Sequence, residues 1–150
     1  MKVFREVLPL RNGQTGSSLV EIAFMLPVLL TIVMGIFTFG IAVNHYLVLT
    51  NSTTVAAQAL AISRGQTSDP CNTAVTAFEA AAPYLTTSNL SFSFAFNGGS
   101  LTSETSCTSQ SLVSGQAAEV QVTYPCNLTV YGVNLAPNCT LTAETTEAIE

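Results

Sequence analysis

Apolar residues dominate the stretch from Ile22 to Val43, which contains no Asp, Glu, Lys or Arg. As an α-helix rising ~1.5 Å per residue, this stretch is about 33 Å long, and the hydrocarbon core of a bilayer is roughly 30 Å thick. The pattern therefore predicts a transmembrane helix over about residues 22–43, with the lipid bilayer as its surroundings.

Beyond Val43 the apolar residues keep a helical spacing, and polar residues fill the positions between them. The expected inward positions are Leu49, Val55 or Ala56, Ala59 or Leu60, and Ile62. Arg64 and Gly65 suit a helix end, because a cation favours the negative terminus and glycine readily adopts a left-handed cap. The first helix is expected from about Ser17 to Ser63, with an amphipathic outer half.

A second, shorter helix is predicted over about residues 71–82. Asp69 can cap its start, Pro70 suits its first turn, and Pro83 ends it. Its expected apolar face comprises Ala74, Val75, Phe78, Ala81 and Ala82.

From Leu90 onward, apolar residues alternate with polar ones, which is typical of half-buried strands. Strands are predicted at about 90–96, 118–124 and 139–149, with a turn at 97–99 and a Ser/Thr-rich loop at 102–115. The inward residues are expected to be Phe92, Phe94, Phe96, Val120, Val122, Tyr124, Leu141 and Ala143.

Together these elements predict an α+β fold. A long N-terminal helix, transmembrane in its first half and amphipathic in its outer half, carries a small head of one short helix and about three antiparallel strands. The expected organisation is a leader or cytoplasmic segment at 1–16, the long helix at 17–64 with its transmembrane span at about 22–43, and an exported head at 65–150.

The few charged residues are distributed unevenly. Only 9% of residues are charged, the net charge is −5, and no basic cluster follows the N-terminus, which argues against nucleic-acid binding. Lys2, Arg5 and Arg11 precede the apolar stretch, whereas Arg64 is the only basic residue after it apart from His45. The positive-inside rule then predicts a cytoplasmic N-terminus and an exported C-terminal portion.

All four cysteines fall on the predicted exported side, where an even number suggests two disulfides. Four cysteines permit three pairings, of which we favour Cys71–Cys107 and Cys126–Cys139, because a hairpin would bring the last two together. A metal site is the rival interpretation. The chain has no CxxC spacing, and its single histidine, His45, lies far away along the sequence, so we expect no metal or cofactor.

No catalytic residues are predicted. No histidine stands near an acid in a motif, and no glycine-rich phosphate loop is present. The outer acids are scattered like solvated charges: Glu104, Glu119, Glu144, Glu147 and Glu150. We therefore expect a protein that is not an enzyme.

Glu21 is an ionisable residue at the start of the apolar stretch, where a carboxylate needs a partner. The pattern of Gly16, four residues, Glu21 and then the apolar stretch resembles the processing site of type IV prepilins, in which a membrane aspartyl peptidase cuts after the glycine. The string VEIAFMLPVLL, residues 20–30, resembles the N-terminal signature of TadE-like pilus proteins.

This resemblance implies a structural pseudopilin or minor pilin that acts in assembly of a tight-adherence pilus in the bacterial inner membrane. The implied partners are a prepilin peptidase acting at Gly16, Ser17 and Glu21, the major pilin, a TadF-like pseudopilin and the inner-membrane assembly platform. The amine that cleavage creates at Ser17 could pair with Glu21, either within one chain or between subunits.

Small residues recur along one face of the predicted membrane helix. They are Ala23, Pro27, Thr31, Gly35, Thr38 and Ala42. In lipid such a face lets a neighbouring helix approach closely, although chance composition would also explain it. Pro27 lacks an N–H and should loosen or kink the helix locally.

Other interpretations of the N-terminal region remain open at this point. The first residues could be an ordinary cytoplasmic tail, or the apolar stretch could belong to a secretory signal peptide. The functional alternative is an uncleaved single-pass membrane protein whose outer head binds a partner or a surface ligand.

Overall fold

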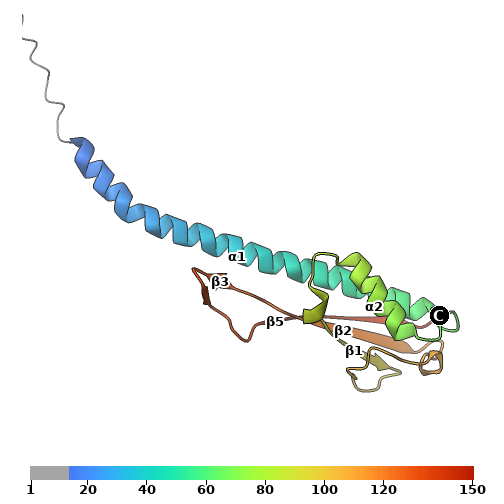
Figure 1. Ribbon diagram of the computed structural model, residues 1–150. Coiled ribbons are helices and arrows are strands. Elements are labelled where there is room, and N and C mark those ends of the chain that lie inside the picture. Colours follow the sequence, from blue (N-terminus) through green and yellow to red (C-terminus); the bar gives the residue numbers. More distant parts are fainter. Residues whose placement is uncertain (1–13) are drawn as a thin grey trace, which may run out of the picture. The chain divides into compact units, whose positions relative to one another are not determined.

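A computed structural model describes residues 14–150, so most of the predicted leader, 1–16, lies outside the described residues. The chain divides into two compact units, Met1–Phe37 and Thr38–Glu150. The first and longest helix, α1 (Gln14–Ile62), contributes to both units (Figure 1).

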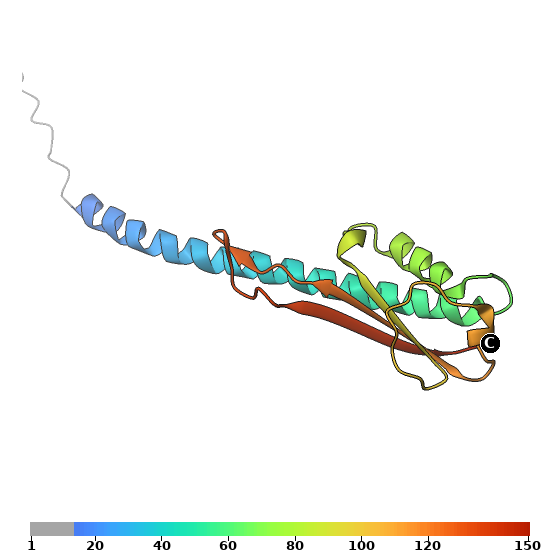
Figure 2. The same ribbon diagram turned by 60° about the horizontal axis from the view of Figure 1, so that its bottom comes forward.

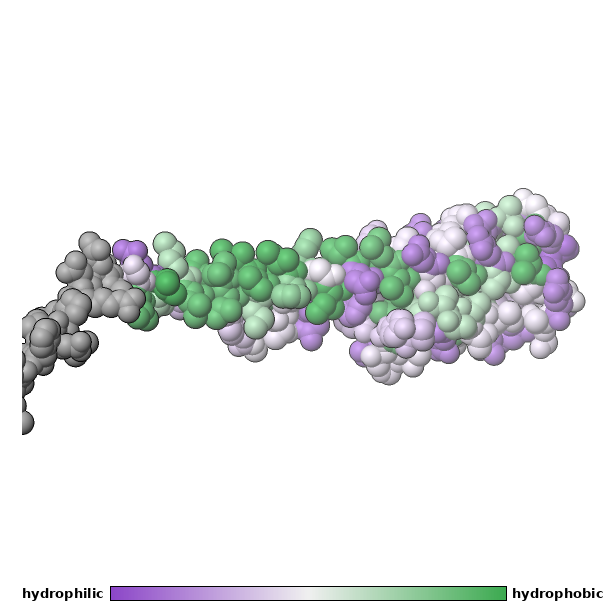
Figure 3. Space-filling view, turned by 90° about the horizontal axis from the view of Figure 1, so that it is seen from above, coloured by the Kyte–Doolittle hydropathy of each residue, from purple (hydrophilic) through white to green (hydrophobic). Residues whose placement is uncertain are grey.

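The described part of the first unit is a single stretch of α1 with outward apolar side chains. It is the one helix among the described residues that is long and apolar enough to cross a membrane. Figure 3 shows this stretch as a largely hydrophobic surface. Helix α1 continues through Pro27, and the Thr31 hydroxyl donates a hydrogen bond of 2.8 Å to the Pro27 carbonyl.

In the second unit, α1 buries one face in the hydrophobic core. Leu49, Ala56 and Leu60 are fully buried, as their spacing predicts. The alternative position Val55 and the expected inward residue Ile62 are exposed, so the prediction for Ile62 is wrong. The buried face continues instead through Ser52 and Thr53, and the Thr53 hydroxyl donates to the Leu49 carbonyl at 2.7 Å.

The short helix α2 (Pro70–Ala81) begins and ends where its sequence signals predict. Asp69 is the N-cap and accepts a hydrogen bond from the Asn72 backbone N–H, while Pro70 occupies the first turn. Residues buried on its inner side are Pro70, Cys71, Ala74 and Phe78, with Ala82 just beyond its end. Ala81, predicted to face inward, is exposed.

Three antiparallel strands form the main sheet in the order β1–β2–β5. Their bounds are Ser91–Phe96 for β1, Ala117–Pro125 for β2 and Thr140–Ala148 for β5. The register places Phe94 opposite Val120 and Val122 opposite Ala143, so buried side chains share the face that packs on the helices. Figures 1 and 2 show α2 and the second-unit part of α1 on the same side of this sheet.

A two-stranded hairpin and two short 3-10 helices complete the second unit. The hairpin consists of β3 (Thr129–Val130) and β4 (Val133–Asn134), and the 3-10 helices are η1 (Thr87–Asn89) and η2 (Ser109–Ser111). A long helix, a short helix and a small antiparallel sheet confirm the predicted α+β fold class.

Candidate functional site

The residues of the predicted processing site lie at the start of α1. Gly16 and Ser17 fall within the first helical turn, and Glu21 follows one turn after Ser17. Residues four apart lie on the same face of a helix, so positions 17 and 21 share one face of α1. The Glu21 side chain is exposed, and among residues 14–150 it forms no ion pair. Its carboxylate is therefore open to a partner.

The predicted stripe of small residues differs in exposure along its length. Ala23, Pro27 and Thr31 are exposed, whereas Gly35, Thr38 and Ala42 are half-buried. In the second unit, Ala42 lines a cavity together with Cys126 and Cys139. At Ala42 the stripe is thus partly covered by other residues of the second unit. Its inner part, from Ala23 to Gly35, is the freer surface, and a Cβ added at Gly35 would meet nothing within 4 Å.

Two disulfides hold the second unit, and no cysteine among the described residues is free. They join Cys71 to Cys107 and Cys126 to Cys139, with Cα–Cα distances of 5.4 and 5.2 Å, which are ordinary for disulfides. These are the two pairs favoured from the sequence.

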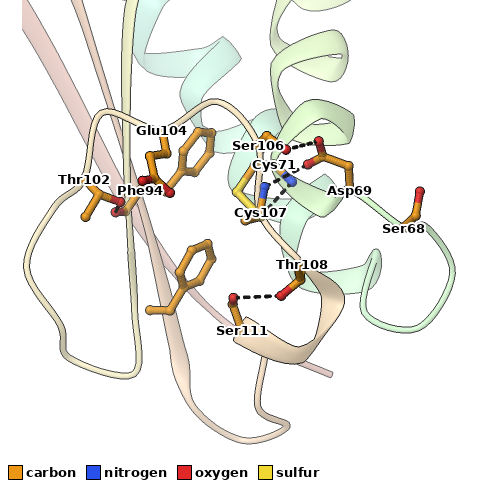
Figure 4. Close-up of a pocket in the computed structure, with 11 residues that line it drawn as sticks. Ser68, Asp69, Cys71, Phe94, Thr102, Glu104, Ser106, Cys107, Thr108 and Ser111 are labelled. Atoms are coloured by element: carbon orange, nitrogen blue, oxygen red, sulfur yellow. Dashed lines mark hydrogen bonds between the residues drawn. A yellow bond between two sulfur atoms is a disulfide. The ribbon is translucent and has the colours of Figure 1, made fainter.

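Asp69 ties the start of α2 to the Ser/Thr-rich loop (Figure 4). Its carboxylate accepts hydrogen bonds from the Ser106 hydroxyl at 2.6 Å and from the Cys107 N–H at 3.0 Å, in addition to capping α2 through Asn72. The Ser106 bond, followed by those from Cys107 and Asn72, lowers the pKa of Asp69 from its ordinary value. The carboxylate is thus fully engaged in holding structure.

A cavity of about 440 Å³ opens beside this cluster. Hydroxyl groups and two carboxylates, those of Asp69 and Glu104, line it together with Phe94 and Phe96 (Figure 4). Among the described residues no three His, Cys, Asp or Glu side chains come together as metal ligands would. The cavity does place one hydroxyl beside a carboxylate, Ser106 on Asp69, but that carboxylate already binds the backbone N–H groups of Asn72 and Cys107 and has a lowered pKa, so it is a weak base.

His45 packs against the sheet. Its ring meets that of Tyr124 edge to face, with centroids 5.8 Å apart. Both residues line a cavity of about 540 Å³ that the β3–β4 region also borders through Asn134 and Pro137. His45 is thus a packing residue in this structure.

Sequence reasoning missed the link from Asp69 to Ser106 and Cys107. The predicted capping role of Asp69 identified one of its partners, Asn72. The other two lie 37 and 38 positions away, in a loop that carries no regular pattern. The cysteine spacing was the only available signal, because the Cys71–Cys107 pair places that loop beside α2.

Within residues 14–150 these features define a protein with one membrane-type helix that continues into a small, disulfide-bonded α+β unit. Residues 16–58 match the model of the TadE-like protein family, which confirms the resemblance over that segment. No curated protein and no solved structure matches the chain. The TadE-like family is a structural, pilus-associated family, and the match covers the membrane-type stretch and part of the outer half of α1, leaving residues 59–150 outside it.

Proposed function

We propose that the chain is a structural pseudopilin, or minor pilin, that acts in the assembly of a tight-adherence pilus. The observation that carries this proposal is the family match over residues 16–58. The match begins at the glycine that should precede the cleaved bond and includes the whole apolar stretch.

In this proposal residues 1–16 are a cytoplasmic leader, residues 17–64 form the long helix and residues 65–150 form an exported head. The span at about 22–43 crosses the bacterial inner membrane. The basic residues before the span favour this orientation through the positive-inside rule. The two disulfides favour it as well, because disulfides persist in an oxidising compartment.

A prepilin peptidase cuts between Gly16 and Ser17 in this scheme. The freed Ser17 amine then lies one helical turn from Glu21. Within one chain such a pair contributes only about 0.3–0.5 kcal/mol where water reaches it. Between packed subunits the pair is shielded, and leaving one charge alone costs several kcal/mol. We therefore assign Glu21 to the amine of a neighbouring subunit, which would be the major pilin or a TadF-like pseudopilin on the assembly platform.

Intact mass of the membrane-extracted protein tests the cleavage. In cells that contain the peptidase, the wild-type chain should lack its first sixteen residues, and Gly16→Leu should accumulate as an inserted precursor. Gly13→Leu is the matched control, because it changes a glycine three positions upstream and should be processed normally. A wild-type chain that keeps Met1 or Lys2 would instead favour an uncleaved single-pass protein whose head binds a partner or surface ligand.

Glu21→Gln tests the subunit pairing separately. This variant should still be cut and inserted, because the apolar stretch and Gly16 are intact. It should co-purify poorly with the other pilins and fail to support piliation. If Glu21→Gln supports piliation at the wild-type level, Glu21 has no role in subunit pairing and acts at most in recognition by the peptidase.

A further inference from the structure

The disulfide-closed hairpin, residues 126–139, exposes an unusual set of apolar side chains. Tyr131, Val133 and Leu135 are 67%, 62% and 67% exposed. The hairpin contains no charged residue, and neither does the whole stretch from 120 to 143. The acids of the second unit all lie outside that stretch. An exposed apolar tip without charge indicates contact with an apolar phase or partner.

The hairpin lies beside the last turns of the predicted membrane span. Phe39, Ala42 and Val43 of α1 line a wholly apolar cavity of about 220 Å³, and the disulfide Cys126–Cys139 lines its other side with Leu128 and Leu141. The apolar span itself ends at Val43. A segment held against these turns sits at the depth of the span's outer end.

The direction of the strands carries the hairpin farther toward the membrane. At one end of the sheet the Glu150 N–H donates to the Ala61 carbonyl at 3.4 Å, and at the other end Tyr124 packs on His45. Strands β2 and β5 therefore run along α1, as Figures 1 and 2 show, and Leu128 of the hairpin lines a cavity with Phe39, which lies before His45 in α1.

Several backbone groups of the hairpin are hydrogen-bonded within it, as an apolar environment requires. The N–H of Cys126 donates to the Cys139 carbonyl at 3.0 Å, and the Leu135 N–H donates to the Leu128 carbonyl at 2.9 Å. The Ala136 N–H is bound by the Asn134 side chain at 3.0 Å. The hairpin can therefore enter an apolar environment without leaving these N–H groups unpaired.

The turn at the tip presents an aromatic residue where the backbone disfavours one. Tyr131 and Gly132 have φ angles of 49° and 80°, the arrangement of a type I′ turn. Asn or Gly is the ordinary choice at the first of these positions, and a bulky side chain there is strained. Tyr is the residue type that membrane–water interfaces enrich. Strain retained at an exposed position points to a function for that side chain.

We propose that the hairpin is a second membrane contact, inserted into the interfacial layer of the outer leaflet beside the span. This inference rests on the transmembrane assignment of the proposed function, but not on cleavage after Gly16. The bilayer, rather than a second protein, fits best because the hairpin shares the depth of the span's end. The absence of acids also avoids repulsion by anionic headgroups.

The chain contains no tryptophan, so a single introduced tryptophan reports its own surroundings. Full-length Tyr131→Trp and Leu135→Trp are reconstituted into phosphatidylcholine–phosphatidylglycerol vesicles whose acyl chains are brominated at defined depths. Both should show blue-shifted emission and at least twofold quenching, strongest with bromine near the headgroups. Thiol labelling without reductant verifies that both disulfides have formed.

Val113→Trp is the matched control. Val113 is also exposed, and it borders Arg64 and Gly65 at the far end of α1, about 29 Å from Val43 along the helix. Its tryptophan should emit as in water and escape quenching. Equal, negligible quenching in all three variants would overturn the proposal.

A protein partner would give a different result. Blue-shifted emission that grows with the protein-to-lipid ratio, without bromine quenching, would mean that the hairpin contacts another copy of the chain and would also overturn the bilayer assignment. Intact mass of the same samples separates the two proposals. An unprocessed chain with a quenched tip would refute cleavage while supporting the membrane contact.

Discussion

The Ser106 hydroxyl donates a hydrogen bond of 2.6 Å to one carboxylate oxygen of Asp69, across 37 positions of sequence. The second carboxylate oxygen accepts the N–H groups of Asn72 and Cys107 at 3.1 and 3.0 Å. One side chain therefore caps α2 and also fixes the loop that carries half of a disulfide.

Asp69 should make the stability of the second unit depend on acid pH. The hydrogen bonds from Ser106, Cys107 and Asn72 place its folded pKa below the ordinary 3.8. The stabilisation is therefore complete above the unfolded pKa of about 4 and is lost as the pH falls through the folded pKa. The thermal midpoint of Asp69→Asn should fall less than that of the wild type between about pH 5 and pH 2.

Ser106→Ala is the control for this effect. This variant keeps the Asp69 carboxylate but removes the hydrogen bond that lowers the carboxylate's pKa most. The fall of its thermal midpoint in acid should therefore lie between the falls of the wild type and of Asp69→Asn. Acid profiles of Asp69→Asn and the wild type that run parallel would show that this carboxylate is not the titrating group.

The buried face of α1 predicts a sharp contrast between two neighbouring aliphatic residues. Leu60 is fully buried and Ile62 is 53% exposed. Leu60→Ala should lower the free energy of unfolding by about 2–5 kcal/mol, whereas Ile62→Ala should change it by less than about 0.5 kcal/mol. Denaturant titrations of the detergent-solubilised protein, followed by near-UV circular dichroism, measure both. Similar losses would contradict the orientation of this helix.

The two disulfides should contribute unequally. They close loops with sequence separations of 36 and 13 residues, so chain entropy predicts about 3.8 kcal/mol for Cys71–Cys107 and about 2.9 kcal/mol for Cys126–Cys139. Replacing each pair by serines and comparing denaturant midpoints tests this order. Labelling of the unreduced wild type should find no free thiol, and labelling of all four cysteines would refute both bonds.

The inner part of the small-residue stripe should mediate helix packing between subunits. A Cβ added at Gly35 or at Gly40 meets nothing within 4 Å, so a larger side chain at either position starts in open space within the single chain. Gly35→Leu should reduce co-purification with other pilins at least fivefold, because Gly35 lies on the stripe. Gly40→Leu, off the stripe, should not. An equal effect of both substitutions would show that the stripe is no packing face and that its spacing reflects chance composition.

Local signals predicted much of the fold. The bounds of α2 follow from Asp69, Pro70 and Pro83, and the alternation of Val120 and Val122 identifies the central strand, because caps and periodicity act over a few residues. The burial of Ser52 and Thr53 could not be predicted from hydrophobicity. Thr53 satisfies its hydroxyl on the preceding turn, so a polar residue occupies the core without an unpaired group.

A hairpin between Cys126 and Cys139 was expected, but the short strands β3 and β4 inside it were equally hard to predict. Its strands pair over only two residues each and show no alternation between buried and exposed positions. The enclosing disulfide and the packing against α1 hold it, and both are long-range. The contacts of Ser106 and Cys107 with Asp69 are also long-range, and no local sequence pattern predicts them.

The position of Arg64 should allow a protease to cut the chain while the two fragments stay associated. Arg64 is exposed just after α1, and no other Lys or Arg occurs between residues 12 and 150. Trypsin therefore has one target bond in this range, and neither disulfide crosses it. Since Leu49, Ala56 and Leu60 remain in the shared core, the nicked halves should travel together in mild detergent and separate in SDS. After this cut, only non-covalent contacts hold α1 on the sheet.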